Sequence, residues 1–208
     1  MESVRVSLRP NWNSPGQAVS VAGLLGSNLG QWDPEEKIQD NQPLKTALRE
    51  AGVSSLVFPG DVGSADFFWN GYGIRRADGT FDLSKRDARG LWQVDYSGYA
   101  RPFMVNEDGS LREFFHGGFD TQNFHEFCKT EGLESICSVN VGRGQARDAA
   151  AWVRWANLEN NYGVRLWRVG TEVGYSWSPA KNLWTGETLT MPVYGRVTRE
   201  YAEAMKAE

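Results

Sequence analysis

The order of secondary-structure patterns is the feature that most limits what this chain can fold into. Short apolar segments of strand-like composition alternate with segments whose apolar residues recur every three or four positions, as on one face of a helix. Such an alternation favours parallel strands joined by right-handed crossovers, which is an α/β architecture. The predicted strands cover residues 19–28, 55–58, 136–141 and 164–169, and the predicted helices are centred on residues 44–51, 124–128, 149–156 and 197–205.

Capping residues mark the ends of the first two helices. Side chains that accept hydrogen bonds precede each apolar stripe, and a glycine follows it, which is the usual punctuation of a helix. The candidate N-caps are Asp40 or Asn41 and Asp120 or Thr121, and the candidate stop residues are Gly52 and Gly132.

Two architectures have this order of elements: a doubly wound open sheet and part of an eight-stranded barrel. A nucleotide-binding open sheet has a glycine-rich turn that leads from its first strand into a helix. Here the glycines of residues 23–30 lead into an acidic, proline-containing loop, so no phosphate cradle is predicted. A complete barrel takes about 250 residues. With four predicted strands, we expect residues 1–208 to form a single α/β domain, a partial (β/α)8 TIM barrel made of the first four β/α units.

Residues 61–118 interrupt the alternation after the second strand. This segment is rich in glycine, aspartate, arginine and aromatic residues, and the pairs Asp78-Gly79 and Asp108-Gly109 are typical of hairpin turns. Loops of this length are usually functional or disordered. The high aromatic content favours a long functional insertion.

Charge and composition exclude several classes of protein. The chain has 22 Lys+Arg, 26 Asp+Glu and no basic cluster, so we expect no nucleic-acid partner. No apolar run approaches the roughly 18 residues of a membrane span, and no signal-like segment is visible at the start, so we expect a cytoplasmic protein without membrane contact. With two cysteines, and with His116 and His125 lacking metal-ligand spacing, we expect no metal ion and no other cofactor.

Active sites of barrels lie at the carboxyl ends of the strands. The fourth predicted strand ends at Thr171 and Glu172, among glycines and aromatic residues. Burial of a carboxyl group against aromatic rings raises its pKa, which allows it to act as a general acid. Glu172 is therefore the best catalytic candidate in the chain, and its alternative is a solvated loop glutamate.

The other strand ends offer polar and aromatic groups that could bind a sugar. An amide such as that of Asn140 can donate to a sugar hydroxyl, or it can cap a loop. The chain has nine tryptophans, and flat rings serve both cores and sugar-binding clefts. Trp152 belongs to a helix face and is predicted to be core, whereas tryptophans in loops are candidates for stacking on sugar. The predicted substrate-binding residues are Asn28, Trp32, Trp69, Asn140, Thr171 and Trp177.

Five segments together resemble a known family. They are Leu25–Trp32, Leu56–Gly60, Ser138–Gly142, Ala149–Asn157 and Tyr162–Glu172, and they occur in this order. They are similar to the α-L-arabinofuranosidases of glycoside hydrolase family 51 and its barrel clan. The most specific part is residues 149–172, where the family reads Ala-Trp-Val-x-Tyr-Ala-Asn, then Tyr-Gly-Val, then Trp-Glu-Ile-Gly-Asn-Glu.

The resemblance implies retaining hydrolysis of arabinofuranosyl or related plant-polysaccharide linkages by two glutamates. Glu172 matches the acid/base of the family. Four replacements depart from the family: Thr171 for an asparagine, Arg168 for a glutamate, Val57 for an arginine and Arg143 for a small polar residue. The family's nucleophile strand has no counterpart, so we expect the N-terminal half of such a hydrolase.

The alternative is a catalytically inactive relative that binds carbohydrate or pairs as a half-barrel. A sheet cut from a barrel has two open edges, which invite pairing. We therefore expect self-association, or association with a complementary half-barrel.

Overall fold

The computed structural model describes several stretches of the chain and some short pieces between them. The described residues are 25–29, 40–60, 64, 67–70, 74–78, 81–88, 90–93, 95, 120–173, 182 and 185–208.

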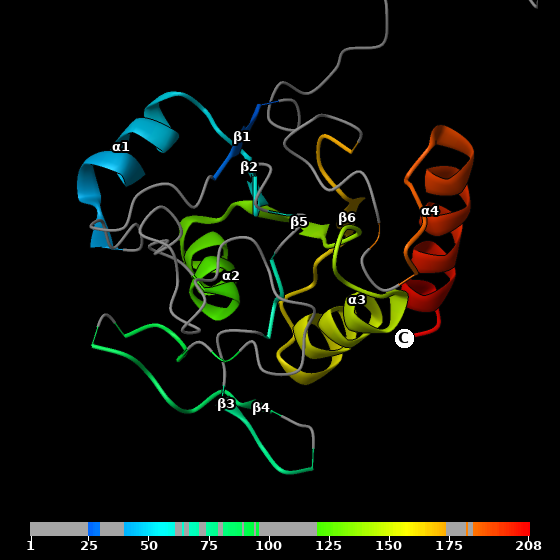
Figure 1. Ribbon diagram of the computed structural model, residues 1–208. Helices are drawn as coiled ribbons and strands as arrows, with labels where there is room; N and C mark the ends of the chain where they lie inside the picture. The colour runs from blue at the N-terminus through cyan, green and yellow to red at the C-terminus, as the bar shows by residue number, and fades with distance from the viewer. Residues whose placement is uncertain are drawn as a thin grey trace, which may run out of the picture.

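Four parallel strands form the central sheet, as predicted (Figure 1). The strands lie in the order β1-β2-β5-β6, which follows their order along the chain. Each strand is followed by a helix, which confirms the α/β class and the first four β/α units of a barrel. The strands are β1 (Gly26–Asn28), β2 (Ser55–Phe58), β5 (Glu134–Val139) and β6 (Leu166–Val169), and the helices are α1 (Gln42–Glu50), α2 (Thr121–Glu131), α3 (Ala146–Val153) and α4 (Met191–Lys206).

The structure shows which of the two candidate residues is the N-cap of each of the first two helices. Asn41 is the N-cap of α1, where its side chain accepts a hydrogen bond from the backbone N–H of Leu44 at 2.9 Å. Asp120 caps α2 by accepting from the N–H of Asn123 at 2.8 Å. Gly132 ends α2 in the left-handed region, with a φ of 68°, where glycine has no steric penalty.

Some element boundaries differ from the sequence prediction, and the strand predicted at 136–141 spans Glu134–Val139. The predicted strand 164–169 begins only at Leu166, because the side chain of Asn157 binds both backbone groups of Val164, at 2.7 and 3.0 Å. The helix predicted around residues 149–156, with a stop at Asn160, begins at Ala146 and continues as the π-helix η5 (Arg154–Glu159), which confirms the predicted end. Of the strand predicted at 19–28, residues 19–24 lie outside the described residues.

The core lies between the sheet and helices α2 and α3. Phe58 on β2 stacks on Phe124 of α2 with ring centroids 4.8 Å apart, and Trp152 is buried, as predicted. The described parts of the 61–118 insertion add to this core, because Phe67 meets Phe58 edge-on and Trp92 meets Trp155. Aromatic residues of the insertion therefore contribute to the hydrophobic core, whatever else the insertion does.

The insertion also contains the predicted hairpin around Asp78. Strands β3 (Ile74–Arg75) and β4 (Phe81–Asp82) pair antiparallel on either side of it. The second predicted turn, at Asp108-Gly109, lies outside the described residues. Within the described ranges, no helix combines the length and the apolar character needed to cross a membrane.

Candidate functional site at the carboxyl edge of the sheet

The parallel register brings the carboxyl ends of the four strands to one edge of the sheet. Asn28 pairs with Val57, and Val139 pairs with Val169 on the other side. The pairing continues past the strand end at Gly170, whose N–H donates to Val139 O at 3.1 Å. The edge that carries the active site in barrels therefore holds the predicted residues Asn28, Asn140, Thr171 and Glu172.

Asn140 follows β5 and is 8% exposed. Its Oδ1 accepts hydrogen bonds from the N–H groups of Arg143 at 2.9 Å and of Gly144 at 3.2 Å, which closes the turn after the strand. The amide thus caps the loop, which is the alternative to sugar binding that the sequence left open. Its Nδ2 is buried and finds no hydrogen-bond partner among the described residues. One end of the amide therefore holds the turn, while the other end is shielded from solvent and has no partner in the described part of the chain.

Helix α4 holds the ends of the two last strands through tyrosine hydroxyls. Tyr201 is buried, and its hydroxyl donates to the backbone carbonyl of Asn140 at 2.8 Å. Tyr194 lies two turns earlier on α4, and its hydroxyl donates to Val169 O at the end of β6. Burial raises the pKa of Tyr201, so this hydroxyl keeps its proton and its donor role. Sequence reasoning missed both roles, because it assigned Tyr201 only to an apolar helix face.

The turn after β6 carries Thr171 and Glu172. Gly170 has a φ of +76°, and a Cβ at this position would lie 2.6 Å from Cγ2 of Val141. Thr171 is 9% exposed, and its Oγ1 is buried without a partner in the described part of the chain. Glu172 adopts a φ of 52°, which is uncommon for a residue other than glycine and recurs at functional sites.

The side chain of Glu172 is exposed, which differs from the predicted burial against aromatic rings. Residues 174–181, which follow it, include Trp177 and lie outside the described residues, as does Trp32. Trp69 packs in the core instead of facing a cleft. Its Nε1 donates to Asp148 O at 3.0 Å, and its ring lies 5.4 Å from that of Trp155. This placement favours the core role over stacking on a ligand.

The remaining residues of the edge are structural. Asn182 donates from Nδ2 to Val141 O at 3.0 Å and so supports the Asn140 turn. Arg168 donates from Nε to Ser138 Oγ at 2.9 Å across the β5–β6 pair. In the described part of the chain, no group of three or more His, Cys, Asp or Glu side chains is placed to hold a metal ion.

The curated proteins that this chain resembles all carry the name of the same activity. The chain is 26% identical over 196 residues to α-L-arabinofuranosidase C of Emericella nidulans, and 28% and 24% identical to probable α-L-arabinofuranosidases C of Aspergillus flavus and Aspergillus niger. Each of these matches covers 85% of this chain and 33% of the relative. The chain thus spans about a third of the length of the curated relatives it matches. No family model matches the chain.

Solved structures show the same fold. An arabinofuranosidase crystal structure matches with a TM-score of 0.55 and 20% identity, covering 88% of this chain and 37% of the other. A family 51 α-L-arabinofuranosidase from Bifidobacterium longum matches with a TM-score of 0.55 and 16% identity, over 88% of this chain and 35% of the other. Together with the curated relatives, these matches confirm the resemblance to arabinofuranosidases and a fold that corresponds to part of a barrel.

Proposed function

We propose that the carboxyl edge of the sheet is a carbohydrate site of the arabinofuranosidase type, with Glu172 in the position of the proton donor. The observation that carries the proposal is that two buried atoms at the ends of the neighbouring strands β5 and β6, Asn140 Nδ2 and Thr171 Oγ1, find no partner within the described residues. A buried polar group left without a partner costs about 1–3 kcal/mol. Hydroxyl groups of a bound sugar would recover this free energy.

Glu172 would protonate the oxygen of the departing group and later activate water. A retaining mechanism needs a second carboxylate as nucleophile, about 5–5.5 Å from the first. Of the four strand ends, within the described residues, that of β6 alone carries a carboxylate. The family resemblance places the nucleophile late in the barrel, beyond these four units, so these units alone would bind the sugar without turning it over.

The other predicted residues take supporting roles in this proposal. Asn140 would donate from Nδ2 to a sugar hydroxyl, while Thr171 would offer its hydroxyl and Asn28 its amide from the far end of the edge. Trp32 and Trp177 would stack on sugar rings. The substrates would be arabinofuranosyl or related linkages of plant polysaccharides.

A second candidate is a carbohydrate-binding relative without catalysis. The exposure of Glu172 favours it, because the packing against aromatic rings that was expected of a proton donor is not found within the described residues. The replacement of the expected asparagine by Thr171 also favours it. The two candidates share the same sugar site and differ only in turnover.

The substitution Asn140→Asp tests the shared site. An aspartate keeps an acceptor for the N–H groups of Arg143 and Gly144 but loses the Nδ2 donor. We expect calorimetric titration with an arabinose-bearing xylooligosaccharide to show binding weakened about tenfold or more. Asn41→Asp is the matched control, because either residue caps a helix N-terminus equally well. Equal affinity of the Asn140→Asp and Asn41→Asp chains would contradict the proposal.

A further inference from the structure

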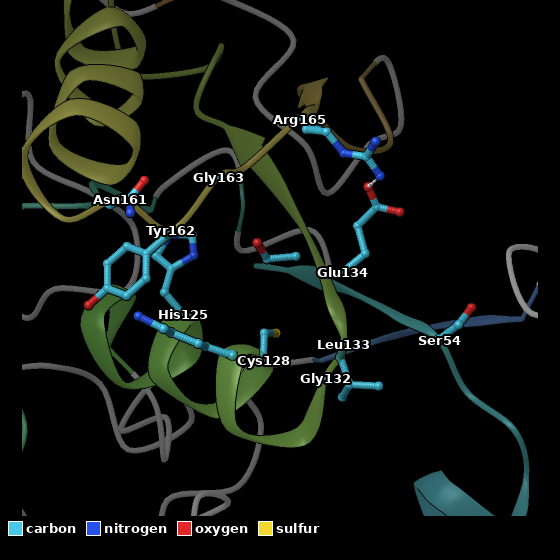
Figure 2. Close-up of a pocket in the computed structure, with 12 residues that line it drawn as sticks. Ser54, His125, Cys128, Gly132, Leu133, Glu134, Asn161, Tyr162, Gly163 and Arg165 are labelled. Carbon is cyan, nitrogen blue, oxygen red and sulfur yellow. Dashed lines mark hydrogen bonds and ion pairs between the residues drawn. The ribbon is translucent and has the colours of Figure 1, made fainter.

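A cavity lies at the opposite edge of the sheet from the candidate site, where the strands begin (Figure 2). Its volume is about 440 Å³, which falls within the usual range of small-molecule sites. Ser54 precedes β2, Glu134 begins β5 and Arg165 precedes β6, so three strands contribute to one wall. Residues at the end of α2 and the segment 161–163 complete the lining.

The walls of this cavity are fixed by hydrogen bonds and packing. The imidazole of His125 stacks on the ring of Tyr162, with centroids 4.8 Å apart and an angle of 15° between the planes. The N–H of Tyr162 donates to Ala156 O at 2.8 Å, and Gly132 donates to Cys128 O where α2 ends. A wall held in this way is preorganised, which lowers the entropic cost of binding.

The charges that line the cavity largely cancel. Arg165 and Glu134 form an ion pair at 2.8 Å (Figure 2). Burial lowers the pKa of His125 to about 3, so the imidazole is neutral near pH 7. Lys129 lies in the last turn of α2, where a cation balances the negative carbonyl end of the helix. The cavity therefore suits an uncharged ligand better than one held mainly by its charge.

We propose that this cavity is a second saccharide site, which binds an uncharged, hydroxyl-rich sugar at the amino edge of the sheet. The choice of a sugar rests on the proposed function of the chain. The cavity offers the hydroxyl of Ser135, the amide of Asn161 and the paired Arg165 and Glu134, while the hydroxyl of Ser54 donates to Leu25 O at 3.0 Å and can still accept. These groups both donate and accept hydrogen bonds, as a polyol requires. The site is separate from Asn140 and Glu172, which lie at the other ends of the strands.

Backbone amide shifts in NMR spectra of the full chain can test this site. We expect an arabinose-bearing xylooligosaccharide to cause saturable shifts at Gly132 and Gly163, and these shifts persist in Asn140→Asp. Arg165→Ala removes a side chain that is 79% exposed, so the fold should survive, and we expect affinity at these amides to fall about tenfold. Arg154→Ala is the control, because it removes another exposed, ion-paired arginine away from the cavity.

Three results would overturn the inference: an absence of shifts at these two glycines, equal affinities of the Arg165→Ala and Arg154→Ala chains, or tighter binding of glucuronate than of the neutral sugar. Failure of the proposed function has a different signature. In that case the shifts near Asn140 and Glu172 are absent, while those at the amino edge remain.

Discussion

At the scale of single residues, His125 shows how a polar side chain became part of the aromatic core. It is 1% exposed, and it lies against Tyr162, Phe124, Trp152 and Trp155. Sequence reasoning found no metal-ligand spacing for this residue and expected it either to pack or to face solvent. The imidazole Nε2 lies 3.9 Å from Cys137 Sγ, and burial among aromatic rings lowers the pKa of His125, so the neutral form is the one that the fold favours.

The burial of His125 predicts a pH dependence of stability. The unfolded chain binds a proton here below an ordinary pKa of 6.5, whereas the folded chain does so only near a pKa of about 3. The free energy of unfolding should therefore decrease as the pH falls through this window, by up to about 1.4 kcal/mol per pH unit. Urea unfolding at several pH values checks this. In His125→Phe the decrease should be smaller, and an unchanged slope would contradict the assignment.

At the scale of elements, the turn after β6 is where backbone conformation sets the position of Glu172. Gly170 lies at a φ of +76° directly against Val141 of the neighbouring turn, and the chain then places Thr171 inward and Glu172 outward. Tyr194 and Tyr201 anchor the two strand ends to α4. The candidate site thus depends on a glycine and a helix that carry no chemistry themselves.

The substitution Gly170→Ala tests this dependence. A Cβ would lie 2.6 Å from Val141 and 2.8 Å from Val173, and the positive φ disfavours alanine. We expect a loss of about 1–3 kcal/mol in the free energy of unfolding. Gly195→Ala in α4 is the matched control, because nothing lies within 4 Å of its Cβ and alanine favours a helix by up to about 1 kcal/mol. Equal midpoints in urea for both variants would contradict this account of the turn.

At the scale of the whole molecule, the sheet is open at both sides within the described residues. β1 pairs only with β2, and β6 pairs only with β5. Leu166 at the start of β6 is 47% exposed. An open parallel edge beside an exposed leucine is a template for another strand.

We therefore expect the chain to associate with itself or with a complementary chain through β6. Light scattering should give a mass above that of one chain and increasing with concentration. Leu166→Lys on the exposed edge should lower the associated fraction, because charge on an edge strand opposes pairing. A single monomeric mass for the unmodified chain at all concentrations would contradict the expectation.

The sequence predicted what depends on local chemistry. The caps at Asn41 and Asp120, the stop at Gly132 and the order of strands follow from side chains close to the elements they define. The hydroxyl bond of Tyr201 to Asn140 joins residues far apart in sequence, so no local pattern indicates it. The same holds for Trp69, whose loop position suggested an exposed ring although its indole binds Asp148 O in the core.

The role of Glu172 as proton donor is the central claim, and supplying a small nucleophile tests it directly. In the proposed mechanism, azide would attack the anomeric carbon of an aryl α-L-arabinofuranoside, the bond to the phenolic oxygen would break, and Glu172 would protonate that oxygen. We expect release of a weakly acidic phenol that requires azide and falls about a hundredfold in Glu172→Gln. Release of an acidic dinitrophenol, which needs no proton, should be unchanged. Equal release of the weakly acidic phenol by both chains would contradict the account.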